Sequence, residues 1–446
     1  MSLKIQVQGL AAVLVLLFST TAMAMVVMPE MPAIEWSRQI GTSYAEYATE
    51  IVVDDSGNTY MVGYEAFPIE DTPDSECNII LYKYDTNGNE VWSTSFGTDV
   101  PEYASSVVLD GSGNLYITGT TSDGLDGNTS KGREDIFLTK YTTGGTKLWT
   151  KQFGTDQNDH GRALTIDDSG NIYLAGYTHG ALNGNTHLGN DDVFLMKLNS
   201  SGNTLWTQQF GTTSREVCLD MAIDDTGDTY ITGYTEGDFG GDNAGGVDMF
   251  LTKYNASGVN QWTRQLGTAD SDIGGGVAVD NNGDIYVTGS TQDAFDGNTY
   301  VGSNDIFVAK YDTNGNKQWT DQFGTLSSDA GSDIAVDSNN ELYLTGTSYG
   351  GLDGVPGVGG TDLFLAKYGA DGARMWTQLL GTNDYDTGGH LVIDGSNNIY
   401  LAGYTYVSME DDDILLFKLS TVPEPGTLAM LAGLAAMGLL YWRKRR

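Results

Sequence analysis

The sequence predicts an all-β fold, a seven-bladed β-propeller of four-stranded blades, from two repeating patterns and one displaced strand. The first pattern is a tryptophan that recurs at intervals of 56 or 57 residues. It stands at Trp36, Trp92, Trp149, Trp206, Trp262, Trp319 and Trp376. Self-similarity at a fixed period of this length is typical of propellers and other repeat architectures. The 446-residue chain therefore holds one repetitive body rather than several unrelated domains.

The second pattern is a set of residues that keep their spacing from each tryptophan. A Gly-Thr pair begins five positions later, an Asp stands thirteen beyond that glycine, a Tyr follows six further on, and a Lys lies near the end of the unit. In the third unit these residues are Gly154, Asp167, Tyr173 and Lys197. The same frame in every unit predicts one structural motif built seven times.

Each unit contains four short runs rich in β-branched and aromatic residues, bounded by Gly, Asn, Asp and Ser. In the third unit the runs are Ala163–Ile166, Asn171–Tyr177, Val193–Leu198 and Thr204–Phe210. This composition and these boundaries predict strands joined by tight turns. Four antiparallel strands repeated around an axis form the blade of a propeller.

The displaced strand predicts how the ring closes. The last unit stops before its tryptophan strand, whereas the chain begins with an unattached one, Ile34–Ile40. Pairing that strand with the last unit completes a seventh blade and removes an exposed sheet edge.

The two ends carry targeting patterns that divide the chain. A single Lys4, an apolar run and Ala22-Met23-Ala24 predict a signal peptide over residues 1–24. A linker over 25–33 precedes the propeller at 34–419, and a second linker over 420–426 follows it. Residues 427–446 are predicted to be a transmembrane helix ending in a basic tail, which would stay in the cytoplasm.

The charge of the chain limits its partners. The formal net charge is −37, and such a surface repels phosphate backbones, so a nucleic-acid partner is excluded. The same surface attracts cations.

The repeats and the tail each resemble a known family. The series Gly-Thr, then A-V-D-x-x-G-N-x-Y-x-x-G, then D-x-F-(L/V)-x-K resembles the bacterial SBBP propeller repeat over roughly residues 34–419. The order Val-Pro-Glu-Pro, apolar stretch and Arg-Lys-Arg-Arg is similar to the PEP-CTERM sorting signal over 422–446.

These resemblances imply where the protein acts. The sorting signal implies export in a Gram-negative bacterium through an inner-membrane intermediate, and recognition at Pro423, Glu424 and Pro425 by an exosortase-type enzyme. It further implies a place at the cell surface or outside the cell, in exopolysaccharide or biofilm material. The repeat family implies the fold and no fixed chemistry.

An acidic residue five positions after each Gly-Thr glycine is the most regular polar feature. The seven are Glu46, Glu102, Asp159, Glu216, Asp272, Asp329 and Asp386. Strand directions place them on the loops entering the innermost strands, at the mouth of the channel, where seven carboxylates could attract cations. The alternative is that each one caps its own loop. Equal presence in every blade favours this structural interpretation.

Two further groups are candidate metal ligands. Loops with Asp126, Asp296 and Asp353 are rich in oxygen ligands and suit Ca²⁺, although Asx turns explain the same residues without metal. His160, His179 and His187 gather in the third unit, where an Asp could complete a Zn²⁺ site. No fixed histidine spacing supports that site, so exposed, unliganded histidines are favoured.

The sequence favours a non-enzymatic role and singles out no catalytic residue. The preferred hypothesis is a surface or matrix protein that binds polysaccharide. Its rivals are a top-face metal-dependent lyase or hydrolase, and a purely structural spacer.

Overall fold

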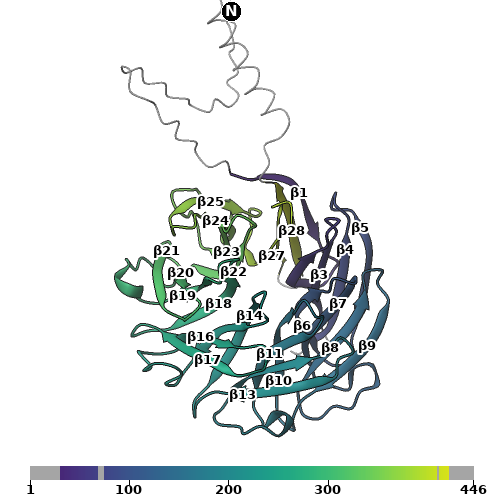
Figure 1. Ribbon diagram of the computed structural model, residues 1–446. Coiled ribbons are helices and arrows are strands. Elements are labelled where there is room, and N and C mark those ends of the chain that lie inside the picture. Colours follow the sequence, from purple (N-terminus) through teal and green to yellow (C-terminus); the bar gives the residue numbers. More distant parts are fainter. Residues whose placement is uncertain (1–30, 69–74, 409–410, 421–446) are drawn as a thin grey trace, which may run out of the picture.

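The computed structural model describes residues 31–68, 75–408 and 411–420. Within these residues the strands form seven four-stranded sheets, all with antiparallel pairing. The sheets stand around a common axis as the blades of a propeller (Figure 1). The predicted seven-bladed propeller is confirmed. We number the blades in chain order, blade 1 beginning with β2 and blade 7 with β26, and call the end of the channel where the inner strands begin the top.

Each blade contributes one strand to each of four layers around the axis. The inner strands are β2 (Ala45–Val53), β6 (Glu102–Leu109), β10 (Asp159–Ile166), β14 (Glu216–Ile223), β18 (Asp272–Val279), β22 (Ala330–Val336) and β26 (Asp386–Ile393). The second strands are β3 (Thr59–Pro68), β7 (Asn114–Thr121), β11 (Ile172–Thr178), β15 (Thr229–Thr235), β19 (Ile285–Thr291), β23 (Leu342–Ser348) and β27 (Ile399–Ser408).

The two remaining layers lie further from the axis. The third strands are β4 (Ser75–Tyr84), β8 (Asp135–Thr142), β12 (Asp192–Leu198), β16 (Asp248–Tyr254), β20 (Asp305–Tyr311), β24 (Asp362–Tyr368) and β28 (Asp411–Ser420). The outer strands are β5 (Glu90–Phe96), β9 (Lys147–Phe153), β13 (Thr204–Phe210), β17 (Asn260–Leu266), β21 (Lys317–Phe323), β25 (Arg374–Leu380) and β1 (Ala33–Ile40). Three short 3-10 turns occur in top loops, at η1 (Leu125–Gly127), η2 (Leu182–Gly184) and η3 (Phe295–Gly297).

The ring closes as the displaced strand predicts. Strand β1 pairs antiparallel with β28, from Ala33 opposite Ser420 to Ile40 opposite Ile414. Blade 7 therefore has the strand order β1-β28-β27-β26 and joins the two ends of the propeller (Figure 1). Trp36 and Ile40 of β1 pack against the core between blades 7 and 1.

The hydrophobic core is divided into seven clusters, each lying between two adjacent blades. In the cluster between blades 1 and 2, Val62 and Leu81 of blade 1 meet Val107 and Phe137 of blade 2. All four of these side chains are buried. A single blade cannot bury both of its faces, so stacking in a closed ring is what stabilises the repeats.

The repeated Asp, Tyr, Lys and Trp meet at the bottom of each blade. In blade 3, the Lys197 ammonium donates to the Tyr173 hydroxyl at 2.5 Å and lies 3.2 Å from Asp167. It also lies 4.6 Å from the centre of the Tyr173 ring, whose other neighbour is the indole of Trp206 at 6.1 Å. The Asp167 carboxylate accepts the backbone N–H groups of the next turn, at Ser169 and Asn171. The most regular residues of the repeat thus build the hairpin that ends each inner strand.

Candidate functional site

The channel contains two adjoining cavities near its top. The upper cavity has a volume of about 350 Å³ and is lined by Tyr64, Tyr103, Arg162 and His390 among others. A smaller space of about 70 Å³ lies against it and shares Arg162 and His390. At the bottom, a separate cavity of about 550 Å³ is lined by the valines Val52, Val108 and Val392 together with Asp54 and Asp110. The two ends of the channel therefore offer different chemistry.

Aromatic side chains form an arc near the top of the channel, and two of them, Tyr64 and Tyr103, line the upper cavity. The ring centres of Tyr404 and Tyr47 are 4.9 Å apart, and those of Tyr47 and Tyr64 are 5.0 Å apart. Tyr103 continues the arc at 5.1 Å from Tyr64. On blade 3, His160 and Tyr177 stack with their centres 4.5 Å apart. The matching positions of blades 5 and 6 hold Ile273, Ser290, Ala330 and Thr347, so the arc is confined to one part of the ring.

A β-bulge in every inner strand shapes the floor of this cavity. The register of each inner strand shifts at the same place, as between Ala48 and Glu50 or between Gly388 and His390. A bulge inserts one unpaired residue and redirects the side chains around it. The residues that follow the bulge in the seven blades form the floor ring: Glu50, Ser106, Ala163, Asp220, Gly276, Asp333 and His390.

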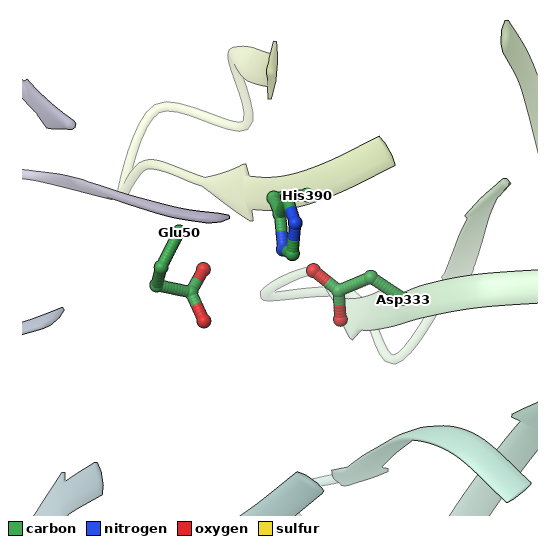
Figure 2. A group of neighbouring side chains, drawn as sticks. All are labelled: Glu50, Asp333 and His390. Atoms are coloured by element: carbon green, nitrogen blue, oxygen red, sulfur yellow. The ribbon is translucent and has the colours of Figure 1, made fainter. Parts of the chain in front are cut away.

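Three members of the floor ring converge in the channel. One ligand atom of each of Glu50, Asp333 and His390 lies within 4.8 Å of the others. Figure 2 shows the two carboxylates and the imidazole pointing toward one another from blades 1, 6 and 7. Within the described ranges these are the only three His, Cys, Asp or Glu side chains that come together this closely.

The floor carboxylates are held by backbone N–H groups. Asp333 accepts from Ile334 and from Leu391 of the next blade, each at 2.7 Å, and Glu50 accepts from Ile51 at 3.0 Å. Burial raises the pKa of Glu50 well above its usual range, and the carboxylates of Asp333 and Asp220 raise it further. Burial also raises the pKa values of Asp333 and Asp220.

The imidazole of His390 differs from these carboxylates in having no hydrogen bond to any described residue. Burial lowers its pKa to about 4, so the ring is neutral at pH 7 and one of its nitrogens carries a free lone pair. A neutral imidazole is the form that binds metals or accepts a proton. The floor thus combines a neutral imidazole with carboxyl groups whose pKa values are raised.

The acidic ring predicted at the channel mouth lies inside the fold. All seven carboxylic side chains have exposed fractions of 1% or less, and none lines the two upper cavities. Each accepts the backbone N–H and the hydroxyl of the threonine in its own Gly-Thr pair, as Asp329 does from Thr325 at 2.6 and 2.8 Å. This residue lies within one position of the start of its inner strand, and its side chain hydrogen-bonds to the preceding loop rather than lining the upper cavities.

The loop aspartates proposed as calcium ligands lie apart, each on its own blade, and each is paired with a cation of its outer strand. Asp126 lies 2.8 Å from the Lys147 ammonium, and Asp296 pairs with Lys317. Asp353 lies 3.0 Å from the Arg374 guanidinium. All three have positive φ, as expected for Asp in tight turns.

Two of the three histidines of blade 3 come together. His160 and His179 have ring centres 6.1 Å apart, and His179 pairs with Asp191, which also binds Arg215. His187 stands apart, with a buried Nε2 that has no partner among the described residues. Burial lowers the pKa of His160 to about 4.

The sequence pattern does not predict the floor ring as a site. Glu50, Asp333 and His390 were not singled out, because the frame was built from residues that agree between units. Four positions after each acidic-ring residue, however, the seven units hold Glu, Ser, Ala, Asp, Gly, Asp and His. This variation between units, so close to a position that is acidic in every unit, is the sequence feature that could have indicated the site.

Both predicted targeting segments lie outside the described residues, as do Pro423, Glu424 and Pro425. Among the residues that the structure does describe, there is no helix of the length and apolarity that a membrane span requires.

Known sequence families match most blades and the C-terminal end. The SBBP beta-propeller repeat matches six segments, residues 35–64, 148–183, 205–240, 261–296, 318–353 and 376–408. Each match runs from an outer strand into the inner and second strands of the following blade. The PEP-CTERM protein-sorting motif matches residues 421–446.

Two curated proteins are similar over parts of their length. The Regulatory protein FlaEY of Caulobacter vibrioides is 32% identical over 170 residues, which cover 35% of this chain and 18% of that protein. An uncharacterized WD repeat-containing protein of Acanthamoeba polyphaga mimivirus is 22% identical over 83% of this chain and 36% of its own length. The chain thus spans about a third or less of either relative.

A solved structure of a protein of unknown function from Dyadobacter fermentans has a TM-score of 0.46 and 12% identity, covering 73% of this chain and 96% of that one.

Proposed function

The chain is an SBBP-repeat β-propeller that ends in a PEP-CTERM sorting motif, and we propose that it is an exported, non-enzymatic binding protein of the exopolysaccharide layer. The sorting motif supports export through a membrane-anchored intermediate. Its partner in that step is an exosortase-type enzyme that recognises Pro423, Glu424 and Pro425. The mature propeller then acts at the cell surface or in the matrix.

The tyrosine arc at the top of the channel is the observation that carries the proposed ligand. Tyr64 and Tyr103 line a cavity of about 350 Å³, and Tyr47 packs against Tyr64. That volume falls within the size range of small-molecule sites. Aromatic rings bury the apolar faces of sugar rings, while nearby polar groups bind their hydroxyls. The Tyr47 hydroxyl is fixed by a 2.7 Å hydrogen bond to Asp412, so the arc is rigid before a ligand arrives. Little conformational entropy is then lost on binding.

The surrounding charge favours a neutral or weakly charged polymer. The net charge of −37 repels polyanions at a distance. Arg162 is the only Lys or Arg among the residues that line the two upper cavities, and it lies over the Tyr177 ring with its guanidinium carbon 5.4 Å from the ring centre. A neutral saccharide segment suits this mouth better than a highly sulfated or uronic-acid chain.

A binding experiment tests the proposal. Neutral and uronic-acid oligosaccharides are titrated into the purified protein, with tyrosine and tryptophan fluorescence and calorimetry as readouts. We expect Tyr64→Ala to weaken binding of a neutral oligosaccharide by about tenfold or more, the loss of one aromatic contact of about 1.5 kcal/mol. Tyr349→Ala is the matched control, because Tyr349 lies outside both cavities and is 45% exposed. Equal affinities of both variants for every oligosaccharide would contradict the proposal.

A second experiment tests the sorting step. Changing Pro423, Glu424 and Pro425 together to Ala should leave the protein in the membrane fraction of its host, whereas the parent is released. Changing Thr427 to Ala beside the motif is the control. Release of the triple variant at the parental rate would contradict recognition by an exosortase.

A further inference from the structure

The floor ring contains more chemistry than the fold requires. At this position Asp333 and Asp220 join neighbouring blades, because one oxygen of each accepts the N–H of the next inner strand, at Leu391 and Val277. Ser106 makes the same kind of bond to Leu164 at 3.2 Å without a charge. Blades 3 and 5 fold with Ala163 and Gly276 at this position. A carboxylate or an imidazole is therefore not needed to join blades.

Glu50 and His390 have no blade-joining role to explain them. Glu50 accepts only the N–H of its own neighbour, Ile51, and His390 has no hydrogen bond to the described residues. Both face Asp333 across the channel (Figure 2). Their three side chains come from consecutive blades 6, 7 and 1, so the closed ring itself brings them together.

The carboxyl groups of the floor are gathered in one small cavity without a paired cation among the described residues. Glu50, Asp220 and Asp333 all line the space of about 70 Å³, and carboxylates that lie close together repel one another when both are ionised. Arg162 is the only Lys or Arg that lines the two cavities. Its guanidinium donates to the Tyr177 hydroxyl at 3.3 Å and pairs with no carboxylate of the described residues. A bound cation would supply the missing charge.

The arrangement resembles a prepared coordination site. Two backbone N–H groups orient the carboxylate of Asp333. Metal-binding side chains are commonly oriented by hydrogen bonds of this kind. The adjoining space of about 70 Å³ has room for an ion and water. An imidazole nitrogen with two carboxylates suits Zn²⁺ and its first-row neighbours, whereas Ca²⁺ and Mg²⁺ take oxygen ligands.

We propose that Glu50, Asp333 and His390 together bind one divalent first-row transition-metal ion, with Zn²⁺ as its representative, in the channel. Three protein ligands leave a coordination position open. His390 lines both cavities, so that position is accessible from the tyrosine-lined space above. A hydroxyl or carboxylate of a ligand in the mouth can occupy it. The metal site does not depend on the identity of that ligand or on whether it is a saccharide.

The repeats themselves supply variants that should fold. His390→Ala reproduces the residue of blade 3, and Asp333→Ser reproduces that of blade 2 together with its hydrogen bond to the next blade. His160→Ala with His179→Ala is the matched control, since these two histidines form the other cluster near the channel. Circular dichroism and thermal melts confirm that each variant is folded.

The experiment measures zinc binding to the purified full chain carrying no histidine tag. The protein is stripped with a chelator and titrated with Zn²⁺ in excess Mg²⁺, which occupies weak surface carboxylates, and bound metal is counted by mass spectrometry. We expect one Zn²⁺ per parent chain, and a loss of affinity of about 100-fold or more in His390→Ala and in Asp333→Ser. The blade-3 double variant should bind as the parent does.

Two results would overturn the site. One is the absence of stoichiometric zinc in the folded parent. The other is parental zinc affinity in both floor variants, which would leave only binding to the acidic surface or to blade 3. Failure of saccharide binding with zinc bound would instead count against the proposed ligand and leave the metal site standing.

Discussion

Two rings of side chains, four residues apart on the same inner strands, are treated differently by the seven repeats. The acidic ring holds Asp or Glu in every blade, and its members are buried against their own Gly-Thr loops. The floor ring holds six kinds of residue in seven places. Every inner strand is preceded by a Gly-Thr loop whose N–H and hydroxyl need an acceptor, so every blade has an acidic residue there. The floor residues face the common channel, so the seven blades need not carry the same residue at that position.

This difference separates residues that support the fold from residues that support chemistry. A side chain repeated in every blade satisfies local donors and acceptors. A position that varies from blade to blade does not have to satisfy the same local donors and acceptors in every blade. At the floor position, Glu50, Asp333 and His390 converge in the channel.

Removing the closing strand should have the largest effect. Deletion of Ala33–Ile40 leaves the outer edge of β28 unpaired, although β28 still pairs with β27. Seven lost pairs at roughly 0.5–1.5 kcal/mol each give a loss of about 5 kcal/mol. Chemical denaturation followed by circular dichroism measures it. A synthetic peptide of the deleted residues, added in trans, should restore part of the stability. An unchanged unfolding free energy would mean that blade 7 does not need β1.

Breaking one member of the acidic ring should cost less but still be severe. Asp159→Ala removes the acceptor of the Thr155 N–H and hydroxyl and of the Thr178 hydroxyl. Buried donors left without partners cost about 1–3 kcal/mol each, so we expect a loss of about 3 kcal/mol. The exposed neighbour Asp168 serves as control, and Asp168→Ala should change stability by less than about 0.5 kcal/mol. Similar losses for both variants would refute a structural role for the ring.

Changing the floor ring should affect stability least. In metal-free protein, His390→Ala should stay within about 1 kcal/mol of the parent, because the imidazole makes no hydrogen bond to the described residues and Ala occupies the same place in blade 3. Equilibrium unfolding in the presence of a chelator is the measurement. A loss as large as that of Asp159→Ala would show that the floor supports the fold after all.

The pH dependence of two aspartates distinguishes a loop cap, Asp159, from a turn residue, Asp110. Burial raises the pKa of Asp159 above 3.8, and its hydrogen bonds do not fully offset this. Burial also raises the pKa of Asp110, but hydrogen bonds from Asn114 and Ser112 outweigh it and lower the pKa below 3.8. Acidification from neutral pH to 3.8 therefore protonates folded Asp159 before the unfolded chain and favours folding, whereas Asp110 loses its contribution only below 3.8.

Asparagine variants convert this difference into opposite trends. The stability deficit of Asp159→Asn relative to the parent should grow as pH falls from neutral toward 3.8, since the variant cannot gain the proton. The deficit of Asp110→Asn, about 1 kcal/mol, should hold steady over that range and shrink below 3.8. Urea titrations at several pH values measure both. Parallel trends would contradict the assigned directions.

Sequence patterns predicted nearly all of the fold because the fold repeats. Trp36 without a unit of its own indicated closure, and β1 pairs where expected. The residue spacing also placed the acidic ring at the entry of each inner strand. The β-bulge is what the pattern could not show, because it is a feature of backbone pairing. It precedes Glu50 and His390 in their inner strands and redirects the side chains around it.

The candidate site was missed for a related reason. Three histidines close in sequence drew attention to blade 3, whereas His390, the fourth, stood alone in its unit. Its partners Glu50 and Asp333 are 340 and 57 residues away, and only closure of the ring brings them within reach. The fold topology brings these distant residues together. In a single sequence they are visible only as residues that differ from their counterparts in the other units.

The most direct test of the separation compares two residues of one strand, Asp386 and His390 of β26. The measurement is the shift of the thermal midpoint on adding Zn²⁺ to Asp386→Asn and to His390→Ala. At free zinc about 100 times the dissociation constant, binding stabilises the folded chain by about 2.7 kcal/mol. We predict that Asp386→Asn melts below the parent yet keeps the zinc-dependent rise, and that His390→Ala melts near the metal-free parent and loses the rise. A rise of equal size in both variants would contradict the account.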